Sequence, residues 1–443
     1  MVLTFVELEA SRQGDQVTDL QRSVSSGRRR VVHYPSANFP LHLCGSLVFS
    51  LSLISAMASY KGPDVLLFAA PTTSADMRWF SQFHAGDPFP AFSAKGKKIG
   101  ILPLLEVGRA KHESDFDVIL NLTEIITTLR KKNPKAGVAE AIIDSARKHG
   151  VRSFTVPHDF PAGLWVSLQA GGLKLSLPGT GRDERSSPQI FPQRAIKTKA
   201  EEAGITAGNR ASSAGFSAVE RILRAAKIKK GFVHWNGKVL TAEILHAEVH
   251  KAVSDADGMN DHGLIIAPGD QAVDCHCAGS GPVRAHEPIV VDIFPRNRAT
   301  GLYGDMTRTY VKGKASPARR RMIETVFGAH RAALKALRAG ATGAEVYFAA
   351  SNFIKEAGYV TENRKGTYVG FFHGLGHGLG YDVHEEPSLS FRNEKPLLPG
   401  HVVTIEPGLY YPGLGGCRFE DVAVVTKTGY KLLSKHPYRW EIA

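Results

Sequence analysis

Four acidic side chains interrupt apolar stretches that are typical of buried β-strands. Asp292 and Asp305 occur in one pair of such stretches, and Glu406 and Glu420 occur in a second pair farther along the chain. Each pair predicts a β-hairpin with one acid in each strand, so we expect two similar hairpins that face each other. Burying a carboxylate is unfavourable unless a positive charge compensates it. A salt bridge explains one such residue, whereas a shared site for divalent cations explains all four, because carboxylate oxygens suit hard cations.

A glycine-rich segment supplies the candidate imidazole ligands of this site. It begins at Phe371 and contains His373, His377 and His384. His373 and His377 are four residues apart, which in a helix would place them on one face. Glycine alternates with other residues here, however, and each glycine destabilises a helix by about 1 kcal/mol. We therefore predict an extended segment in which the histidines act separately, with an imidazole that would admit Co²⁺, Zn²⁺ or Fe²⁺ besides Mn²⁺.

Two other histidine clusters have metal-like spacing but are predicted to be structural. His246 and His250 stand in the order His-Ala-Glu-Val-His, where the Glu is misplaced for the zinc-protease motif His-Glu-x-x-His, so a solvated helix face is expected. In a strand, His276 would point away from the thiols of Cys275 and Cys277. We therefore expect His276 alone to face the site and the two cysteines to lie in the core.

The remaining pattern divides the chain into two parts. From residue 65 to 156, short apolar runs alternate with helical stretches, including a helix expected over 119–131, which predicts an α/β region. Residues 179–192 are rich in Gly, Pro and Ser and are the best linker candidate. Amphipathic helices are expected over 197–226 and 242–255, and the rest of the chain contains long apolar strands punctuated by Gly and Pro.

Composition limits the classes of function. A chain of 443 residues is too long for one core, so two domains are expected. The net charge of +13 invites nucleic-acid binding, but the basic residues are scattered, with arginine triplets only at Arg28–Arg30 and Arg319–Arg321, so we expect no nucleic-acid partner. Four cysteines without paired spacing suggest no disulfide framework and favour a reducing compartment, the cytoplasm.

The first sixty residues do not resemble part of a folded domain. An uncharged stretch over 41–57 follows three arginines, so a signal peptide or membrane anchor within 28–58 is one interpretation. The stretch is short and rich in Ser for a membrane span, and a regular strand pattern begins only at Asp64. We therefore favour Met57 as the true start, with residues 1–60 as a poorly structured or misassigned extension and no membrane attachment.

Taken in chain order, these motifs resemble those of the pita-bread metallopeptidases, which include Xaa-Pro aminopeptidase, prolidase, methionine aminopeptidase and creatinase. The motifs are Gly-Asp-Met-Thr-Arg-Thr, His-Gly-Leu-Gly-His-Gly-Leu-Gly, Asp-Val-His-Glu-Glu-Pro, Ile-Glu-Pro-Gly and Arg-Phe-Glu-Asp. The resemblance implies a mixed α/β (α+β) chain with a creatinase-like N-terminal domain, 64–185, and a pita-bread catalytic domain, 190–443. The N-terminal domain counts against methionine aminopeptidase, and the complete ligand set counts against creatinase, which uses no metal.

The resemblance also implies roles for single residues. The implied ligands of two divalent ions are Asp292, Asp305, His377, Glu406 and Glu420, of which Asp305 and Glu420 would bridge both ions. The implied substrate-side residues are His276, His373 and His384, with Arg418 steadying Glu420. His384 would hydrogen-bond the developing oxyanion, and Glu406 would also carry a proton to the leaving nitrogen. The chain departs from the family at Phe294, where glycine is usual, and the 294–304 loop looks longer, which bears on substrate preference.

The activity implied is that of an Xaa-Pro aminopeptidase, which releases the N-terminal residue of peptides with proline in the second position. Two metal ions are expected, Mn²⁺ before Co²⁺, Zn²⁺ or Fe²⁺, and a homodimer is expected because family members are often dimeric. One alternative is a prolidase, which cleaves only Xaa-Pro dipeptides and differs in how it holds the substrate carboxylate; no single arginine decides between the two. Another is a catalytically silent binding module, which the complete ligand set argues against.

Overall fold

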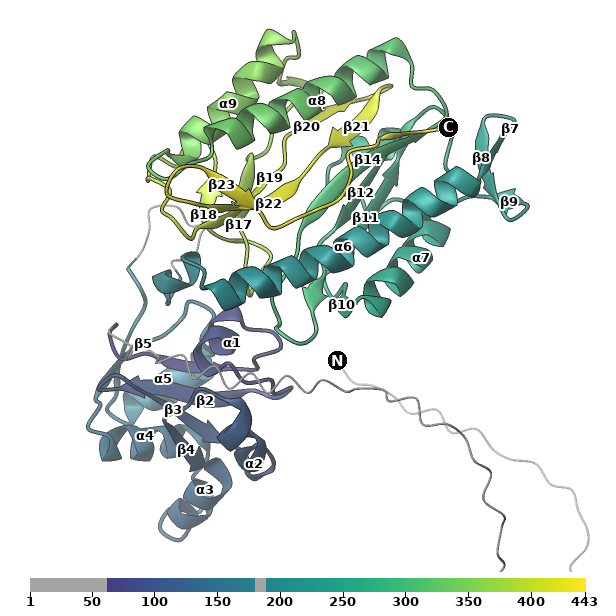
Figure 1. The fold of residues 1–443 in the computed structure, drawn as a ribbon. Helices are drawn as coiled ribbons and strands as arrows, with labels where there is room; N and C mark the ends of the chain where they lie inside the picture. Colours follow the sequence, from purple (N-terminus) through teal and green to yellow (C-terminus); the bar gives the residue numbers. More distant parts are fainter. Residues whose placement is uncertain (1–61, 180–188) are drawn as a thin grey trace, which may run out of the picture. The chain divides into compact units, whose positions relative to one another are not determined.

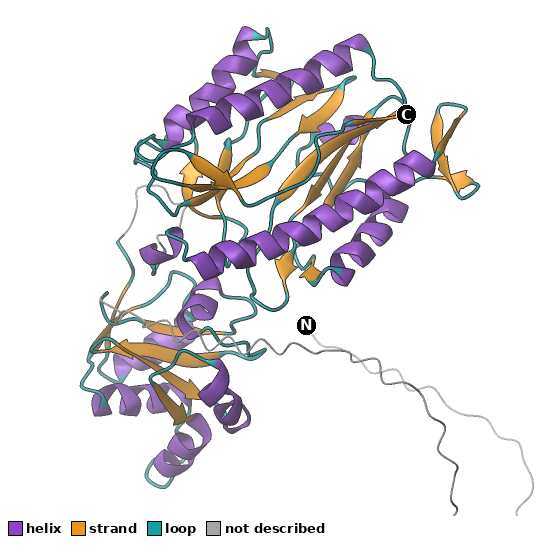
Figure 2. Ribbon diagram, viewed as in Figure 1, coloured by secondary structure: helices purple, strands orange, loops and turns teal. Residues whose placement is uncertain are grey.

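The structure is a computed structural model that describes residues 62–179 and 189–443. Three expectations concern residues that lie outside these ranges: the extension 1–60, the start at Met57 and a targeting segment. Most of the predicted linker also lies outside them. Within the described ranges the chain contains both helices and strands, so the mixed α/β class expected from the sequence is confirmed (Figure 2). No helix in these ranges is long and apolar enough to cross a membrane.

The first described part of the chain contains a four-stranded sheet and five helices. The strands, in sheet order, are β1 (Leu66–Ala69), β2 (Phe89–Ala94), β3 (Lys97–Leu102) and β4 (Val118–Asn121), and only the β3–β4 pair is parallel. The helices are α1 (Ala75–Ser81), α2 (Leu104–Glu113), α3 (Leu122–Arg130), α4 (Val138–Lys148) and α5 (Ala162–Ala170). A short parallel pair joins β5 (Ser153–Thr155) to β6 (Lys174–Ser176).

The helix predicted over 119–131 begins later than expected. Residues 118–121 form strand β4, and α3 begins at Leu122. The Oδ1 atom of Asn121 accepts hydrogen bonds from the backbone N–H groups of Thr123 (3.0 Å) and Glu124 (3.3 Å). This side chain is therefore the N-cap, and it separates a strand from a helix that apolar periodicity alone merges.

Two long helices cover one sheet of the second part. Its strands are β11 (Ile265–Pro268), β12 (Pro288–Ile293), β14 (Met306–Lys312) and β24 (Glu441–Ile442). The helices α6 (Lys199–Ala225) and α7 (Ala242–Asp255) lie along this sheet (Figure 1). Buried apolar residues such as Phe216 of α6, Val249 of α7 and Val291 of β12 belong to one core between them.

A second helix pair covers the second sheet. Its strands, in sheet order, are β18 (Glu385–Leu389), β17 (Gly376–Gly378), β19 (Val402–Ile405), β22 (Asp421–Val425) and β23 (Tyr430–Leu432). Helices α8 (Pro317–Ala336) and α9 (Gly343–Glu356) lie over it (Figure 1). Ile323 of α8, Val346 of α9 and Val403 of β19 share one core. Each helix pair therefore covers one face of its sheet, and the uncovered faces of the two sheets form a common interior.

Short elements connect these layers. The small pairings are β7 (Lys227–Lys229) with β8 (Phe232–Trp235) and β9 (Lys238–Val239), β10 (Gly258–Met259) with β13 (Arg296–Asn297), β15 (Glu362–Arg364) with β16 (Thr367–Val369), and β20 (Gly408–Tyr411) with β21 (Gly415–Arg418). Two 3₁₀ turns, η1 (Pro192–Ala195) and η2 (Gly269–Val273), precede α6 and follow β11.

The two predicted hairpins form, but three of the four acids lie beyond their strands. Strand β12 pairs with β14 and β19 pairs with β22, both antiparallel, and Asp292 lies within β12. Asp305 precedes β14, Glu406 follows β19 and Glu420 precedes β22. The backbone N–H groups of these three acids donate hydrogen bonds to residues outside the paired strand of their hairpin. The N–H of Glu406, for example, donates to Leu375 O at 2.8 Å. Placing one acid inside each strand was therefore wrong by one residue at three positions.

Candidate metal centre

One pocket of about 470 Å³ gathers the residues that the sequence singled out. Its lining includes Asp292, Asp305, His377, Glu406 and Glu420, together with His276, His373, His384 and Arg418. The acids reach it from the ends of the two hairpins, and the histidines reach it from the glycine-rich segment and from the turn after η2. The two sheets thus bring together side chains that lie more than one hundred residues apart in the chain.

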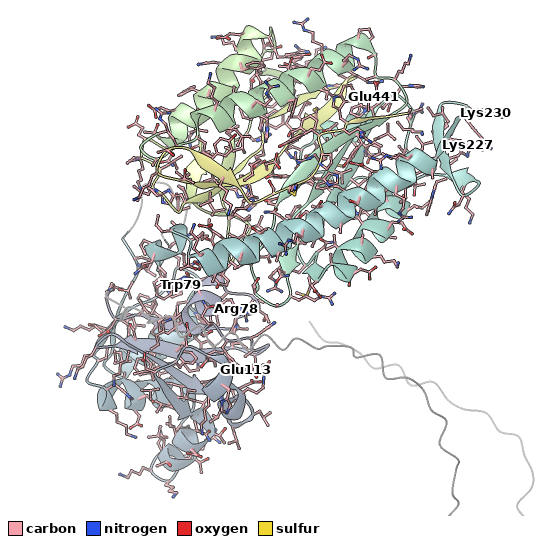
Figure 3. The ribbon with its side chains drawn as sticks, in the orientation of Figure 1. Arg78, Trp79, Glu113, Lys227, Lys230 and Glu441 are labelled. Carbon is pink, nitrogen blue, oxygen red and sulfur yellow. The ribbon has the colours of Figure 1, made fainter. Side chains whose placement is uncertain are left out.

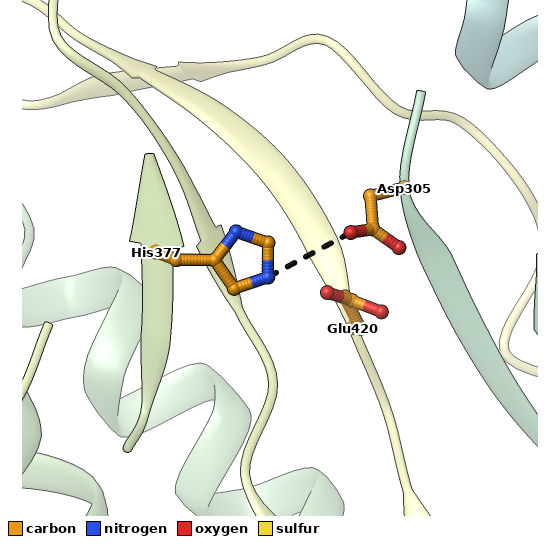
Figure 4. Close-up of side chains that lie close together, drawn as sticks. All are labelled: Asp305, His377 and Glu420. Carbon is orange, nitrogen blue, oxygen red and sulfur yellow. Dashed lines mark ion pairs between the residues drawn. The ribbon is translucent and has the colours of Figure 1, made fainter. Parts of the chain in front are cut away.

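Three side chains form the tightest cluster in this pocket. Ligand atoms of Asp305, His377 and Glu420 all lie within 4.8 Å of one another, and the three side chains converge (Figure 4). The Nε2 atom of His377 is 3.7 Å from Oδ2 of Asp305 and 3.2 Å from Oε1 of Glu406. Two carboxylates and an imidazole at these separations are a donor set that fits a divalent cation.

The buried carboxylates repel one another, which also fits bound cations. Burial, followed by the charge of a neighbouring acid, raises the pKa of Asp305 and of Glu420 well above the usual range. Among the described residues, no group donates a hydrogen bond to the buried Oδ1 of Asp292. A cation would supply the positive charge that these oxygens lack and would keep the carboxylates ionised.

Glu406 and His377 form a hydrogen-bonded pair inside the pocket. Burial alone would raise the pKa of Glu406, but the hydrogen bond and charge of His377 outweigh it and lower this pKa to about 2. Burial alone would lower the pKa of His377, but Glu406 and then Asp305 raise it to about 9. Glu406 and His377 thus stabilise each other's charged forms.

Arg418 contacts the acids differently from the expectation. Its Nη2 donates to Oδ2 of Asp292 at 2.8 Å, and its Nε donates to Oγ1 of Thr307 at 3.1 Å. The Thr307 hydroxyl donates in turn to Oε2 of Glu420 at 2.8 Å. The guanidinium thus binds Asp292 directly and reaches Glu420, its expected partner, only through Thr307. Tyr410 completes the contacts, because its hydroxyl accepts a hydrogen bond from Nη1 at 2.9 Å.

The histidines on the substrate side differ in environment. The Nε2 atom of His373 is 3.0 Å from the hydroxyl of Tyr410, and burial lowers the pKa of His373. The ring of His384 meets the ring of His377 edge-on, with centroids 4.3 Å apart. Burial and the charge of His377 lower the pKa of His384 to about 4. His384 is therefore a neutral imidazole at pH 7, with one N–H to donate.

The region around Cys275 corrects one prediction. Residues 274–276 form a bend and turn rather than a strand, and both Cys275 and His276 line the pocket. Oδ1 of Asp274 accepts a hydrogen bond from the His276 N–H at 3.2 Å, as in an Asx turn. Alternation of side chains does not apply in a turn, so the reasoning that separated His276 from both thiols was wrong. Cys275 and Cys277 are half-buried rather than in the core.

The histidine pair at 246 and 250 lies on a helix, as expected. His246 and His250 lie on α7, outside the pocket lining. The Nε2 atom of His246 is 2.9 Å from Ala278 O, and Nδ1 of His250 is 3.1 Å from the side-chain nitrogen of Asn260. One nitrogen of each ring therefore has a partner within the protein.

Close backbone approach explains a glycine of the histidine segment. Gly376 begins β17, and a Cβ atom at this position would lie 2.0 Å from Thr404 O of the neighbouring strand. The hydroxyl of Thr404 also accepts a hydrogen bond from the N–H of His377 at 3.0 Å. The segment is extended at 376–378, as predicted for the whole segment, and only a residue without a side chain allows its backbone to pack this closely against β19.

A buried ionic network lies directly behind His384. The Nζ of Lys197 is 2.6 Å from Oε2 of Glu385, and both side chains are 1% exposed. Arg194 binds the other oxygen of Glu385, which also accepts a hydrogen bond from the N–H of Asp382 at 3.0 Å. Burial alone would raise the pKa of Glu385, but Lys197 and Arg194 lower it. The network therefore fixes the turn that presents His384 to the pocket.

The chain is similar in sequence and in fold to known proteins. The sequence model of metallopeptidase family M24 matches residues 203–427, which is half of the chain. The Xaa-Pro dipeptidase of Pyrococcus furiosus is 43% identical over 131 residues, which is 30% of this chain and 35% of that protein. The first curated relatives are thus matched over about a third of their length. The Xaa-Pro dipeptidase of Lactobacillus delbrueckii subsp. lactis is 28% identical over 377 residues, 84% of this chain and 92% of that protein.

Two solved structures share the fold. The X-Pro aminopeptidase from Thermotoga maritima MSB8 has a TM-score of 0.69 at 23% identity, covering 86% of this chain and 97% of that one. The Xaa-Pro dipeptidase from Bacillus anthracis has a TM-score of 0.70 at 21% identity, covering 86% of this chain and 95% of that one. At such identities the likeness concerns the fold.

Proposed function

Because the chain belongs to metallopeptidase family M24, we propose that it hydrolyses the peptide bond before proline with two divalent cations in the 470 Å³ pocket. The observation that carries this proposal is the convergence of four carboxylates and one imidazole on that pocket. The proposed ligands are Asp292, Asp305, His377, Glu406 and Glu420. When bound, divalent cations lower the pKa of a coordinated water and polarise a carbonyl group.

The donor set supports Mn²⁺ as the first candidate. Carboxylates outnumber imidazoles among the proposed ligands, which suits a harder cation. The single imidazole, from His377, also accommodates Co²⁺, Zn²⁺ or Fe²⁺. Arg418 supports the site by holding one oxygen of Asp292, so that the other oxygen would be available to a cation.

The chain's own residues orient the substrate and move protons. Neutral His384 can donate a hydrogen bond to the carbonyl oxygen as negative charge develops on it. His373, held by Tyr410, offers an apolar ring face to the proline side. The carboxylate of Glu406, in contact with the pocket, can accept a proton and pass it to the leaving nitrogen. His276 lies on the same lining and is proposed to contact the substrate.

The comparisons support the dipeptidase alternative better than the aminopeptidase that the sequence favoured. Both curated relatives described above are named Xaa-Pro dipeptidase, and one of them aligns along 84% of this chain. We therefore propose Xaa-Pro dipeptides as the preferred substrates. An Xaa-Pro aminopeptidase is the second candidate, because a solved structure of that name shares the fold.

A substrate-length assay tests the proposal. The protein would be stripped of metal, reconstituted with Mn²⁺, Co²⁺, Zn²⁺ or Fe²⁺ in turn, and given Xaa-Pro, Xaa-Pro-Xaa and Xaa-Ala peptides. We expect metal-dependent hydrolysis of Xaa-Pro above all. Faster release from Xaa-Pro-Xaa would favour the aminopeptidase, and no hydrolysis with any metal would favour the silent binding module.

Three further expectations complete the proposal. We propose a creatinase-like domain over 64–185 and a catalytic domain over 190–443. We also propose a cytoplasmic homodimer that binds neither nucleic acid nor membrane. Limited proteolysis tests the domain boundaries, and light scattering of the purified protein gives the number of subunits; a monomeric mass would contradict the dimer.

A further inference from the structure

Two proposed metal ligands stand at the starts of strands that belong to different sheets. Asp305 precedes β14 of the first sheet, and Glu420 precedes β22 of the second. Within the described residues, no strand pairing joins β14 to β22, so the hydrogen bonds inside either sheet do not set the distance between the two acids. The contacts that cross from β14 to the start of β22 therefore determine this distance.

Arg308 of β14 makes several of these crossing contacts. Its Nη1 donates to Glu420 O at 2.7 Å and to Thr307 O at 2.9 Å. Its Nη2 donates to Oδ1 of Asp421 at 3.0 Å and to His436 O at 3.1 Å. One guanidinium thus holds the backbone on both sides of the junction, and the backbone of a proposed ligand, Glu420, is among its acceptors.

Thr307 completes the junction between the two strands. The backbone N–H of Glu420 donates to Thr307 O at 3.1 Å, which is the carbonyl oxygen that also accepts from Arg308. The Thr307 hydroxyl donates to Oε2 of Glu420 at 2.8 Å. Because Thr307 follows Asp305 closely in the chain, these hydrogen bonds tie the positions of the two acids to each other.

Asp421 balances the charge of Arg308 in the interior of the protein. Both side chains are 1% exposed. The carboxylate of Asp421 also accepts hydrogen bonds from the hydroxyls of Ser434 and Tyr438, both at 2.7 Å, and Nε2 of His330 lies 3.2 Å from its Oδ2. Breaking a buried ion pair leaves an uncompensated charge, so this partner restricts the guanidinium to one position.

The C-terminal segment, residues 436–442, packs against this junction. The guanidinium carbon of Arg308 lies 4.6 Å from the centroid of the Tyr438 ring, so the tyrosine covers one face of the guanidinium. Farther along, Glu441, which is labelled in Figure 3, pairs with Val311 where β24 lies parallel to β14. The hydroxyl of Tyr438 also binds the carboxylate at the start of β22, so the segment contacts both hairpins.

We propose that Arg308 is a positioning residue of the metal centre, which sets the separation of Asp305 and Glu420. Arg308 does not line the pocket, so it acts through the backbone of Glu420 rather than by contact with an ion or a substrate. This inference rests on the proposed function, because it requires cations bound between the two acids. A pair of ions needs both carboxylates at once, whereas His377 and Glu406 also help to hold a single ion. Loss of the junction therefore weakens the binding of the second ion first.

Metal content tests this inference directly. The full-length protein would be loaded with Mn²⁺, freed of excess by gel filtration, and analysed for its Mn²⁺ content and for the electron paramagnetic resonance signal of a coupled Mn²⁺ pair. The wild type should hold two coupled ions per chain. Arg308→Lys keeps the charge but loses the planar fork of N–H groups that reaches Glu420 and Asp421 together. We expect this variant to bind its second ion about 10- to 100-fold more weakly and to lose the coupled signal.

A double variant without the buried charges separates positioning from stability. Arg308→Met alone leaves Asp421 buried without its ionic partner, so the urea concentration at the midpoint of unfolding should fall. Arg308→Met combined with Asp421→Asn removes both charges and should recover most of that stability, but it should not recover the second ion. Recovery of both would mean that Arg308 serves only to compensate Asp421, and it would overturn the positioning role.

Arg320 provides the matched control. It lies on α8 and binds Glu441 of the same C-terminal segment, with Nη2 2.5 Å from Oε2, but its side chain is 40% exposed. Arg320→Met should leave two coupled ions bound. Two coupled ions bound to Arg308→Lys as tightly as to the wild type would overturn the inference. A wild-type protein that binds no divalent cation would instead overturn the proposed function itself.

Discussion

The buried pair of Lys197 and Glu385 leads to a quantitative prediction about stability. Both side chains are 1% exposed, and the ammonium is 2.6 Å from the carboxylate. Lys197→Met removes one charge and leaves the other buried. Breaking a buried pair in this way typically destabilises a protein by about 3–5 kcal/mol. Because Arg194 still binds Glu385, we expect a loss at or below the lower end of this range, about 2–3 kcal/mol.

A double-mutant cycle separates the interaction energy of the pair from the effects that each substitution has by itself. Urea unfolding would be measured for the wild type, Lys197→Met, Glu385→Gln and the double variant. We expect a coupling energy of at least about 1.5 kcal/mol, since the second substitution removes the charge that the first leaves uncompensated. Turnover should fall with Lys197→Met, because Glu385 holds the turn that carries His384.

A neighbouring lysine gives the control for this cycle. Lys199 lies two residues away and pairs with Glu202 at 2.6 Å, but its side chain is 88% exposed. Lys199→Met should change stability less, by no more than about 1 kcal/mol, because solvent screens the exposed ammonium even though the carboxylate of Glu202 is only 6% exposed. If Lys197→Met were as mild as Lys199→Met, or if the cycle showed no coupling, the network would not compensate buried charge and the reasoning would be refuted.

Three further predictions concern the site and its support. Glu420→Gln should remove bound metal and activity together, whereas His384→Ala should keep the metal and lower kcat about 10²- to 10³-fold; equal metal loss in both, by elemental analysis, would contradict this division. Gly376→Ala should destabilise the fold by about 2–4 kcal/mol in urea unfolding, since its Cβ would meet Thr404 O at 2.0 Å; a neutral change would mean that β17 shifts freely. Burial, with the charge of Lys197, lowers the pKa of His401 to about 4. An unfolded histidine titrates near 6.5, so the stability that neutral His401 contributes is present above that pH and is lost as the pH falls toward 4. The free energy of unfolding of His401→Gln should therefore fall less between pH 7 and 5 than that of the wild type, by about 1 kcal/mol after allowance for solvent screening. An unchanged dependence of the unfolding free energy on pH would count against this prediction.

The sequence predicts the acids of the site more readily than their supports. A carboxylate in an apolar stretch is conspicuous in any fold, so Asp292 and Glu420 could be found without knowing how the strands pair. Thr307 and Tyr410 were missed, because a hydroxyl in a strand is ordinary until Arg418 is seen to bind it. Both lie in or beside the quoted motifs, but only tertiary contact reveals what they hold. The catalytic roles themselves stay predictions.

Local capping accounts for the errors in the elements. The bend at residues 274–276 and the late start of α3 each depend on one polar side chain, Asp274 or Asn121, that binds backbone N–H groups. Predictions from hydrophobic periodicity depend on the apolar residues, so they do not detect such polar capping residues. The mixed α/β class was predictable because it depends on many residues at once, whereas these boundaries depend on one residue each.

The arrangement of the two hairpins has a consequence for the order of folding. The hydroxyl of Thr307 and the carboxylate of Glu420 are 113 residues apart in the chain, and Arg418 and Asp292 are 126 apart. Such contacts form late, because the entropy of closing a long loop must be overcome before they contribute. Each hairpin and its covering helices can assemble from local contacts first. The pocket comes into existence only when the two finished halves dock, so capacity for metal should return during refolding later than secondary structure does.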